Sequence, residues 1–245
     1  MPGGATEALD HLQITDPASI AATFDIHKRV FAEAGQSAAF SRIIALVVQP
    51  GAEFGHADVV HYAPEKARGL SSALTELRGM VFEAHSTDCQ TEAGLRQLVT
   101  DGVCILKVDP WLTFARREAL YCLDAITDVL DVDGHPPRHR LMATLEVAMQ
   151  SVPGHWAKHY HSTEHKLWLQ RHFSCLDRIR DYSPDPAVET AVRALRSRLV
   201  GRRIPAPLLG QYLPALSGAE GGSFDDLLLR SVERVLGVYM ASIRA

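Results

Sequence analysis

Polar side chains that could perform acid–base or electrostatic chemistry follow two short apolar segments of the chain. His85 and Asp88 follow the segment at residues 80–84, and Lys107 lies near the end of a second one at residues 103–108. A neutral imidazole can ligate a metal or move a proton, and a carboxylate can orient that imidazole or bind a sugar hydroxyl. A strand-end lysine suits a phosphate or an enolate. The alternatives are that His85 and Asp88 only cap a loop and that the Lys107 side chain only extends into solvent.

A second group of candidates, Gln49, Glu53 and His56, follows an aliphatic run at residues 42–48. A second histidine with a carboxylate is what a three-ligand catalytic metal site needs, and Gln49 adds an amide donor. The alternative is an ordinary loop without a metal. Because chemistry sits at the carboxyl ends of parallel strands, we expect both groups at one edge of a sheet.

The segments that must position these residues form strand–helix–strand units. The predicted order is a helix from Asp16–Pro17 to Gly35, strand 42–48, helix 64–77, strand 80–84, a short helix at 91–100, strand 103–108 and a long helix at 112–130. Crossover helices between apolar strands predict a parallel sheet. Further on, helical patterns occupy 138–150, 164–181, 186–200 and 223–243. We therefore predict an α/β region at residues 1–134 and a helical extension at 135–245.

Composition restricts the class of protein. The chain has 245 residues, 47% of them hydrophobic and 22% charged, with a net charge of −4 spread without long runs, so nucleic-acid binding is not expected. No signal peptide and no membrane-spanning run is recognised, which predicts a cytoplasmic protein. The four cysteines form no Cys-x-x-Cys pair and are expected to be reduced.

Two other groups have less specific patterns. Arg178, Arg180 and Tyr182 could clamp a phosphate through bidentate guanidinium contacts, or could be ordinary cations near a helix end. Five histidines between residues 155 and 172 lack a His-Glu-x-x-His motif, so we predict a solvated face rather than a metal site. Because no phosphate-binding loop motif occurs, no nucleotide cofactor is expected.

Several stretches, all in order along the chain, carry a family resemblance. They are residues 43–54, 83–88, 105–108, 112–115, 117–119, 177–180 with Tyr182, and 211–214. These stretches resemble the Z-type (GatZ/KbaZ-like) subunit of class II D-tagatose-1,6-bisphosphate aldolase, and the match runs nearly end to end. The resemblance implies the C-terminal part of a (β/α)8 TIM-type barrel, with about three parallel strands, strands six to eight, and a helical C-terminal extension.

The resemblance also implies that the chain begins inside the barrel, because relatives have five more strand–helix units before the segment that is here Pro2–Gly4. Three strands alone leave two sheet edges, so such a fragment is expected to be marginally stable and inactive by itself. Relatives tend to have Tyr, Gly and Trp where this chain has Cys89, Asp109 and Ser183. Those differences lie beside expected site residues.

Two functions follow from the resemblance. The first is a non-catalytic accessory subunit that stabilises the catalytic class II tagatose-bisphosphate aldolase subunit. The alternative is a D-tagatose-6-phosphate 4-epimerase, which interconverts ketose phosphates when the chain is full length. A tagatose-6-phosphate kinase is disfavoured because phosphate-binding loops are absent.

If the chain belongs to an epimerase, the resemblance implies the following roles for its residues. The catalytic residues would be His85, Asp88 and Glu53, and the metal ligands of a divalent ion such as Zn²⁺ would be His85 and His56. The substrate-binding residues would be Gln49, Thr87, Lys107, Arg178, Arg180, Tyr182 and Gln211.

Overall fold

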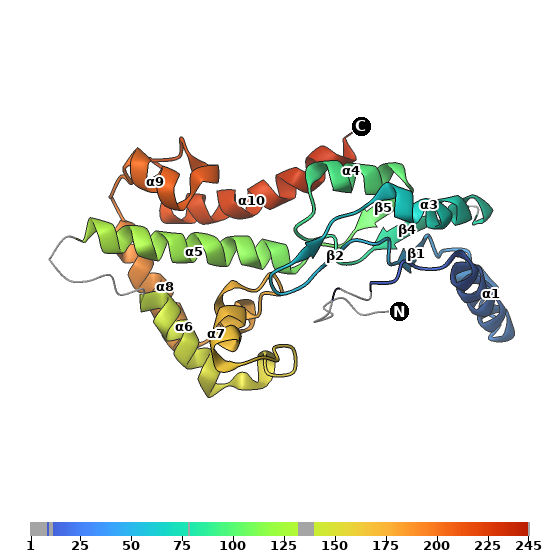
Figure 1. Cartoon of the computed structure of the whole chain (residues 1–245), viewed down its shortest axis with the longest axis horizontal. Coiled ribbons are helices and arrows are strands. Elements are labelled where there is room, and N and C mark those ends of the chain that lie inside the picture. The colour runs from blue at the N-terminus through green and yellow to red at the C-terminus, as the bar shows by residue number, and fades with distance from the viewer. Residues whose placement is uncertain (1–8, 10–11, 78, 132–139, 245) are drawn as a thin grey trace. The chain divides into compact units, whose positions relative to one another are not determined.

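The computed structural model describes residues 9, 12–77, 79–131 and 140–244 of the chain (Figure 1). The chain divides into two compact units. The sheet unit comprises residues 1–108 and 238–245, and the helical unit comprises residues 109–237. The expected boundary at residue 134 lies outside the described residues and stays a prediction.

A three-stranded parallel sheet forms the centre of the sheet unit. Its strands are β1 (Ala45–Val48), β4 (Val81–Ala84) and β5 (Val103–Leu106), in the order β1-β4-β5. All three predicted strands and their parallel pairing are therefore confirmed, and the protein is of mixed α/β class. The register aligns Val48 with Ala84, and Ala84 with Leu106, so all three strands end at the same edge.

Two helical segments connect these strands as the crossover pattern predicts: α3 (Pro64–Ala73) with the 3-10 turn η2 (Leu74–Glu76) lies between β1 and β4, and α4 (Glu92–Thr100) lies between β4 and β5. Helices α1 (Pro17–Glu33) and α2 (Ser37–Phe40) precede β1. The Asp16 carboxylate caps α1 and the Thr91 hydroxyl caps α4, each accepting a bond from a first-turn amide. Phe82, Leu95 and Leu98 have no exposed surface and belong to the core of this unit.

A short antiparallel hairpin follows β1 where the sequence predicts only a loop. It pairs β2 (Glu53–Phe54) with β3 (Val59–Val60), and the Gly55 amide donates to the Asp58 carbonyl at 2.8 Å. Two-residue strands are too short to produce a periodic sequence pattern, which explains why the hairpin was not predicted. The hairpin places Glu53 on a strand.

The helical unit contains helices and 3-10 turns, with no strand among its described residues. Its elements are α5 (Pro110–Leu130), α6 (Arg140–Ser151), η3 (Pro153–His155), α7 (Glu164–Phe173), η4 (Ile179–Tyr182), α8 (Pro186–Leu199), α9 (Ala206–Tyr212) and η5 (Pro214–Leu216). Helix α10 (Phe224–Ile243) begins in this unit and ends in the sheet unit. The core of the helical unit includes Leu123, Leu145, Met149 and Leu209.

The predicted helix at 164–181 is wrong over its second half. Helix α7 ends at Phe173 because Ser174 is extended, with ψ 138°, and its hydroxyl accepts a bond from the Leu176 amide at 2.9 Å. A serine that bonds to nearby backbone offers the chain an alternative to the helix. Helix α9 was not predicted.

All four cysteines are free thiols, as predicted. A search of the described helices finds none with the length and apolarity needed to cross a bilayer.

Candidate active site

Five polar residues gather in and around the loops that follow β1 and β4, and we call them the edge cluster. They are Gln49, Glu53, Ser86, Thr87 and Asp88, and each is between 0 and 7% exposed. Buried polar groups are costly unless they are partnered, so a cluster of this kind at the carboxyl ends of parallel strands indicates a functional site. Of the predicted residues, Gln49, Glu53, Thr87 and Asp88 belong to it.

Glu53 lies at the centre of the edge cluster. Its Oε2 accepts a bond from the Gln49 amide nitrogen at 3.2 Å, and its Oε1 accepts one from the Phe54 backbone amide at 3.1 Å. Burial raises the pKa of this carboxyl above its ordinary value; a bond with Ser86 opposes the shift, while the negative charge of Asp88 adds to it. Glu53 is therefore a carboxyl that can exchange a proton closer to neutral pH than an exposed glutamate can.

The loop that carries Asp88 has an unusual backbone. Ser86 and Cys89 have φ values of 58° and 59°, in the left-handed region that disfavours residues other than glycine. Such conformations cost of order 1–3 kcal/mol each and persist where the surroundings fix them. Here the fixed residue is Thr87, which is fully buried and donates its hydroxyl proton to the Lys107 carbonyl at 2.8 Å. A structural role thus accounts for the Thr87 hydroxyl, and substrate binding by it is only a prediction.

His85 is oriented by a residue that the sequence analysis missed. Its Nε2 lies 3.0 Å from Glu83 Oε1, and each side chain is a little over a quarter exposed. When Nε2 donates its proton to the carboxylate, Nδ1 keeps its lone pair for a metal or a substrate proton. The two-residue spacing was a usable signal, because alternate residues of a strand share a face.

The described residues do not form a complete metal site. No group of three or more His, Cys, Asp or Glu side chains gathers in this part of the chain with the geometry of a ligand set. His56 lies between β2 and β3, and His85 is paired with Glu83. A catalytic zinc site needs three protein ligands, so the residues of the described ranges do not fit that ion by themselves.

Lys107 lies directly after β5, and its side chain is exposed. Its backbone amide donates to the Ala84 carbonyl at 3.0 Å, which continues the β4–β5 ladder by one bond. Lys107 therefore follows the same sheet edge as the edge cluster.

The remaining predicted residues belong to the helical unit. Arg180 forms an ion pair with Asp109, and Arg178 is partly exposed in the same segment. The Tyr182 hydroxyl is committed to the Val152 carbonyl at 2.6 Å, and Gln211 is exposed on α9. A neighbouring carboxylate thus already neutralises the guanidinium that was predicted to bind phosphate.

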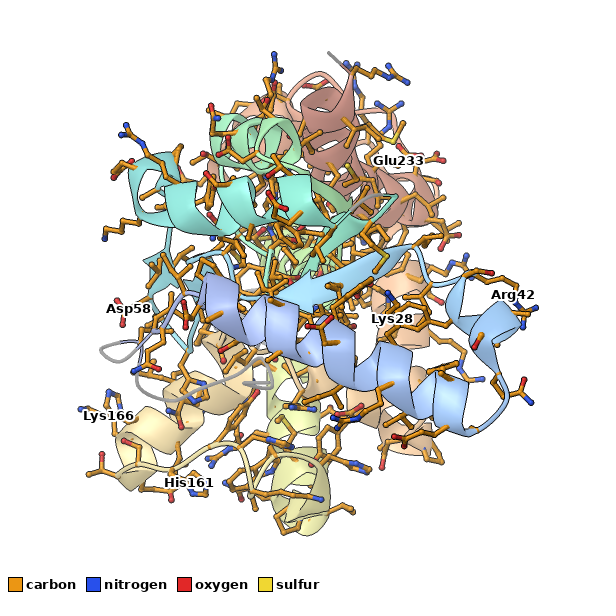
Figure 2. The ribbon with its side chains drawn as sticks, turned by 90° about the vertical axis from the view of Figure 1, so that its right-hand side faces the viewer. Lys28, Arg42, Asp58, His161, Lys166 and Glu233 are labelled. Carbon is orange, nitrogen blue, oxygen red and sulfur yellow. The ribbon has the colours of Figure 1, made fainter. Side chains whose placement is uncertain are left out.

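The predicted solvated histidine face is wrong for His172. His172 has no exposed surface, and its Nδ1 lies 2.7 Å from the Tyr121 hydroxyl while its Nε2 lies 2.9 Å from Glu146 Oε2. Burial lowers the pKa of this imidazole, although Glu146 opposes the shift. By contrast, His161 projects from the outside of the helical unit (Figure 2).

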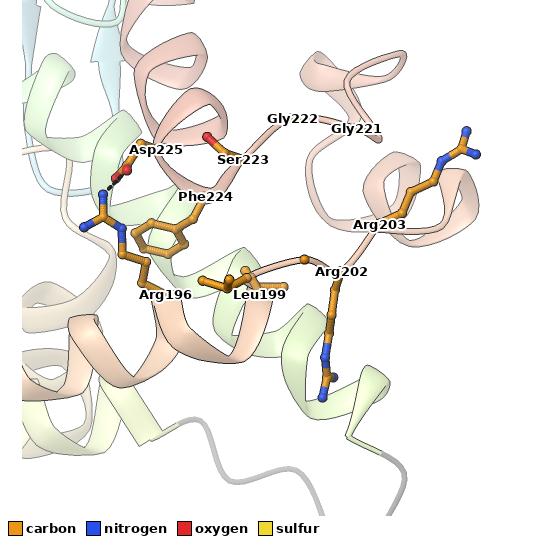
Figure 3. A pocket seen from close by; sticks show the side chains of 11 residues that line it. Arg196, Leu199, Arg202, Arg203, Gly221, Gly222, Ser223, Phe224 and Asp225 are labelled. Carbon is orange, nitrogen blue, oxygen red and sulfur yellow. Dashed lines mark hydrogen bonds and ion pairs between the residues drawn. The ribbon is translucent and has the colours of Figure 1, made fainter.

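A cavity of about 530 Å³ in the helical unit is lined by the end of α8 and the start of α10 (Figure 3). Arg196, Arg202 and Arg203 line it, which suggests an anion site. However, Arg196 pairs with Asp225, and the amide and hydroxyl of Ser223 both donate to Asp226. Acidic residues in the first turn of α10 therefore already occupy Arg196 and the Ser223 donors, and Asp131 forms an ion pair with Arg202.

Comparison with known proteins identifies a family. The family described as "D-tagatose-1,6-bisphosphate aldolase subunit GatZ/KbaZ-like" matches residues 1–243. The chain is 46% identical over 245 residues to a protein of Agrobacterium fabrum named D-tagatose 6-phosphate 4-epimerase, and it spans 57% of that protein. A crystal structure titled "probable tagatose 6 phosphate kinase" from Sinorhizobium meliloti 1021 matches 95% of this chain, with a TM-score of 0.88 and 45% identity.

The chain spans 61% of that solved chain, so it corresponds to little more than half of either relative. The strand-end motifs that carry the resemblance lie within the matched residues. The chain therefore belongs to the GatZ/KbaZ-like family of D-tagatose-1,6-bisphosphate aldolase subunits.

Proposed function

We propose that this chain carries part of the active site of a ketose-phosphate 4-epimerase, which interconverts D-tagatose 6-phosphate and D-fructose 6-phosphate. The observation that carries the proposal is the buried pair of carboxyls, Glu53 and Asp88, at the carboxyl ends of parallel strands. The name of the Agrobacterium relative supports the same reaction. A buried carboxyl with a raised pKa suits a reaction in which one proton is removed and returned.

The chemistry at C4 can proceed by breaking and remaking the C3–C4 bond. Glu53 takes the proton of the C4 hydroxyl, the C4 oxygen becomes an aldehyde oxygen, and the bonding electron pair moves to the C2 carbonyl as an enolate. The aldehyde group rotates, the enolate carbon C3 adds to the opposite face of the aldehyde carbon C4, and Glu53 returns the proton to the C4 oxygen. Asp88 holds sugar hydroxyls, and Lys107 offers a positive charge to the enolate or the phosphate.

We also infer that the three strands are strands six to eight of a (β/α)8 barrel. Within the part of the chain that the structure describes, the sheet ends at β1 on one side and at β5 on the other, and a closed barrel would pair both of these edges. The match to the solved relative covers nearly the whole of this chain but 61% of the other one.

Two preparations test the epimerase proposal. The chain is assayed alone, and again after mixing with the N-terminal segment of the Agrobacterium relative that the match does not cover. Fructose 6-phosphate is the substrate, and nuclear magnetic resonance detects tagatose 6-phosphate. Turnover in either preparation supports the proposal. No turnover in both, while the intact relative is active in the same buffer, would contradict it.

The family description favours a second candidate, in which the chain supports an aldolase subunit without catalysis. The catalytic class II tagatose-bisphosphate aldolase subunit would then be the partner, and its thermal inactivation should slow when this chain is added. If Asp88→Asn lowers the rate of epimerisation but keeps that protection, the two roles are separate. Protection by a chain that never shows epimerisation would favour the accessory role.

Phosphate binding gives a further prediction, based on the Asp109–Arg180 ion pair. If Arg180 binds the substrate phosphate, Asp109→Ala removes a competing carboxylate, so we expect affinity for fructose 6-phosphate to rise about threefold to tenfold. Titration calorimetry on the active preparation measures the change, and Asp225→Ala, which frees Arg196 instead, is the matched control. Unchanged affinity in Asp109→Ala would exclude Arg180 as the phosphate ligand.

A further inference from the structure

Near its C-terminal end, α10 contacts the loop of the edge cluster through the side chain of Tyr239. The Tyr239 hydroxyl donates to the Thr87 carbonyl at 2.9 Å and lies 3.1 Å from the Thr87 hydroxyl. Each hydroxyl has one proton, and the Thr87 proton goes to the Lys107 carbonyl. Tyr239 is therefore the donor to the loop, and the 3.1 Å approach is a polar contact.

The loop needs such a clamp because of its backbone. Ser86 and Cys89, on either side of Thr87 and Asp88, both have left-handed φ values. Strained conformations of this kind are maintained only where neighbouring groups fix them. Thr87 is held from two directions, by the end of β5 through the Lys107 carbonyl and by α10 through Tyr239.

Tyr239 is suited to a permanent donor role. It is 8% exposed, and burial raises the pKa of its phenol, with Asp88 and Cys89 adding to the shift. The phenol is therefore protonated throughout the physiological pH range.

The end of α10 is also attached independently of Tyr239. The Ser242 hydroxyl lies 2.7 Å from the Val238 carbonyl of its own helix and 3.1 Å from the Glu92 carbonyl, and Arg96 donates to the Ala241 carbonyl at 3.3 Å. The contacts of Ser242 with Glu92 and of Arg96 with Ala241 join α10 to α4 and leave the loop untouched. They provide a way to separate the docking of the helix from the effect of Tyr239 on the loop.

We propose that Tyr239 is a positioning residue, which reaches from the C-terminal helix to fix the Ser86–Cys89 loop and so presents Ser86 and Asp88 to Glu53. The catalytic part of this inference rests on the proposed epimerase function, whereas the loop anchor does not. It also assigns the last turn of α10 to the scaffold of the site, although some 150 residues separate it from the loop in sequence.

Hydrogen–deuterium exchange of Tyr239→Phe tests the anchor without requiring activity. We expect amides in a peptide covering residues 85–91 to exchange about tenfold faster, because the hydrogen bond to the Thr87 carbonyl is lost. Peptides covering β5 should be unchanged. Ser242→Ala, a buried hydroxyl in the same turn, is the matched control and should leave residues 85–91 protected.

Two exchange results would overturn the anchor. One is an unchanged peptide 85–91 in Tyr239→Phe, and the other is an equal increase in Tyr239→Phe and Ser242→Ala, which would assign the effect to docking of the helix. Thr87→Val and Thr87→Ser form a second pair, and only the valine variant should loosen the loop.

Turnover distinguishes this inference from the proposed function. In the active preparation, Tyr239→Phe should lower kcat about tenfold with little change in KM, because it disturbs the placement of groups and not their identity. A loosened loop with normal kcat would refute the positioning role. A loosened loop together with no epimerase activity in either preparation would refute the proposed function and support the anchor.

Discussion

Replacing Glu53 by glutamine should abolish most epimerisation, with kcat lower by about 10²- to 10⁴-fold, the usual contribution of a positioned general base. The amide keeps the size of the side chain and can still contact Gln49, but it cannot accept and return a proton. The measurement is the rate of tagatose 6-phosphate formation in the active preparation. Thermal unfolding of the same variant should show a folded protein, because the change relieves a buried carboxyl of its desolvation cost.

The pH dependence of the same rate provides a second measure. Burial raises the pKa of Glu53, so the rise of kcat with pH should be centred above the pKa of an ordinary glutamate. Asp88→Asn removes one negative charge that contributes to that shift, and it should move the acid limb of the profile to lower pH. Gln49→Glu adds a charge beside Glu53 and should move the limb the opposite way. A Glu53→Gln variant with more than a tenth of the normal rate would exclude Glu53 as the base.

The elements that carry the site could be predicted from local sequence signals. Asp16–Pro17 and Thr91 are capping residues with well-understood chemistry, and they start α1 and α4 where the sequence predicts. The three apolar runs became parallel strands because their pattern is that of strands covered by crossover helices. Placing Asp88 and Glu53 at one edge follows from that topology alone.

What could not be predicted depends on partners that are distant in the sequence. Tyr239 meets Thr87 across 152 positions, and no periodicity or motif indicates that contact. In the sequence, His172 cannot be distinguished from the other polar residues of a histidine-rich stretch. In the structure, Tyr121 and Glu146 supply the partners that allow its burial. A buried polar residue is stable only when its partners are in place, so it cannot be recognised before the fold is known.

The second large effect is expected at Arg117, another buried residue whose partners are distant in the sequence. It is 4% exposed on α5, its Nε lies 3.5 Å from Asp177 Oδ1, and it also donates to the His172 carbonyl. The 3.5 Å separation is long for a hydrogen bond, so the attraction is chiefly between charges. Both residues are buried, and Asp177 directly precedes Arg178 in the segment leading to Arg180. Loss of Arg117 would leave a carboxylate in a low-dielectric interior.

We therefore expect Arg117→Met to lower the free energy of unfolding by about 3–5 kcal/mol near neutral pH, the usual consequence of removing one partner of a buried ion pair. Chemical denaturation of the full chain measures the loss. The double variant Arg117→Met/Asp177→Asn should recover part of it, since the uncompensated charge is gone. Equal losses in the single and double variants would assign the effect to packing of the arginine and not to its charge.

The pH dependence of that loss has a definite sign. Burial raises the pKa of Asp177, and the Arg117 guanidinium opposes the shift. Without Arg117 the folded-state pKa rises further above its unfolded value, so the variant is least destabilised at acid pH and loses stability as pH rises through the folded-state pKa. The difference in unfolding free energy between wild type and variant should therefore shrink as pH falls. Arg117 also helps to lower the pKa of His172, so its removal shrinks the difference at acid pH in the same direction. The part that belongs to Asp177 should disappear in Arg117→Met/Asp177→Asn, and an equal pH dependence in the single and double variants would show that Asp177 is not the group left unpaired.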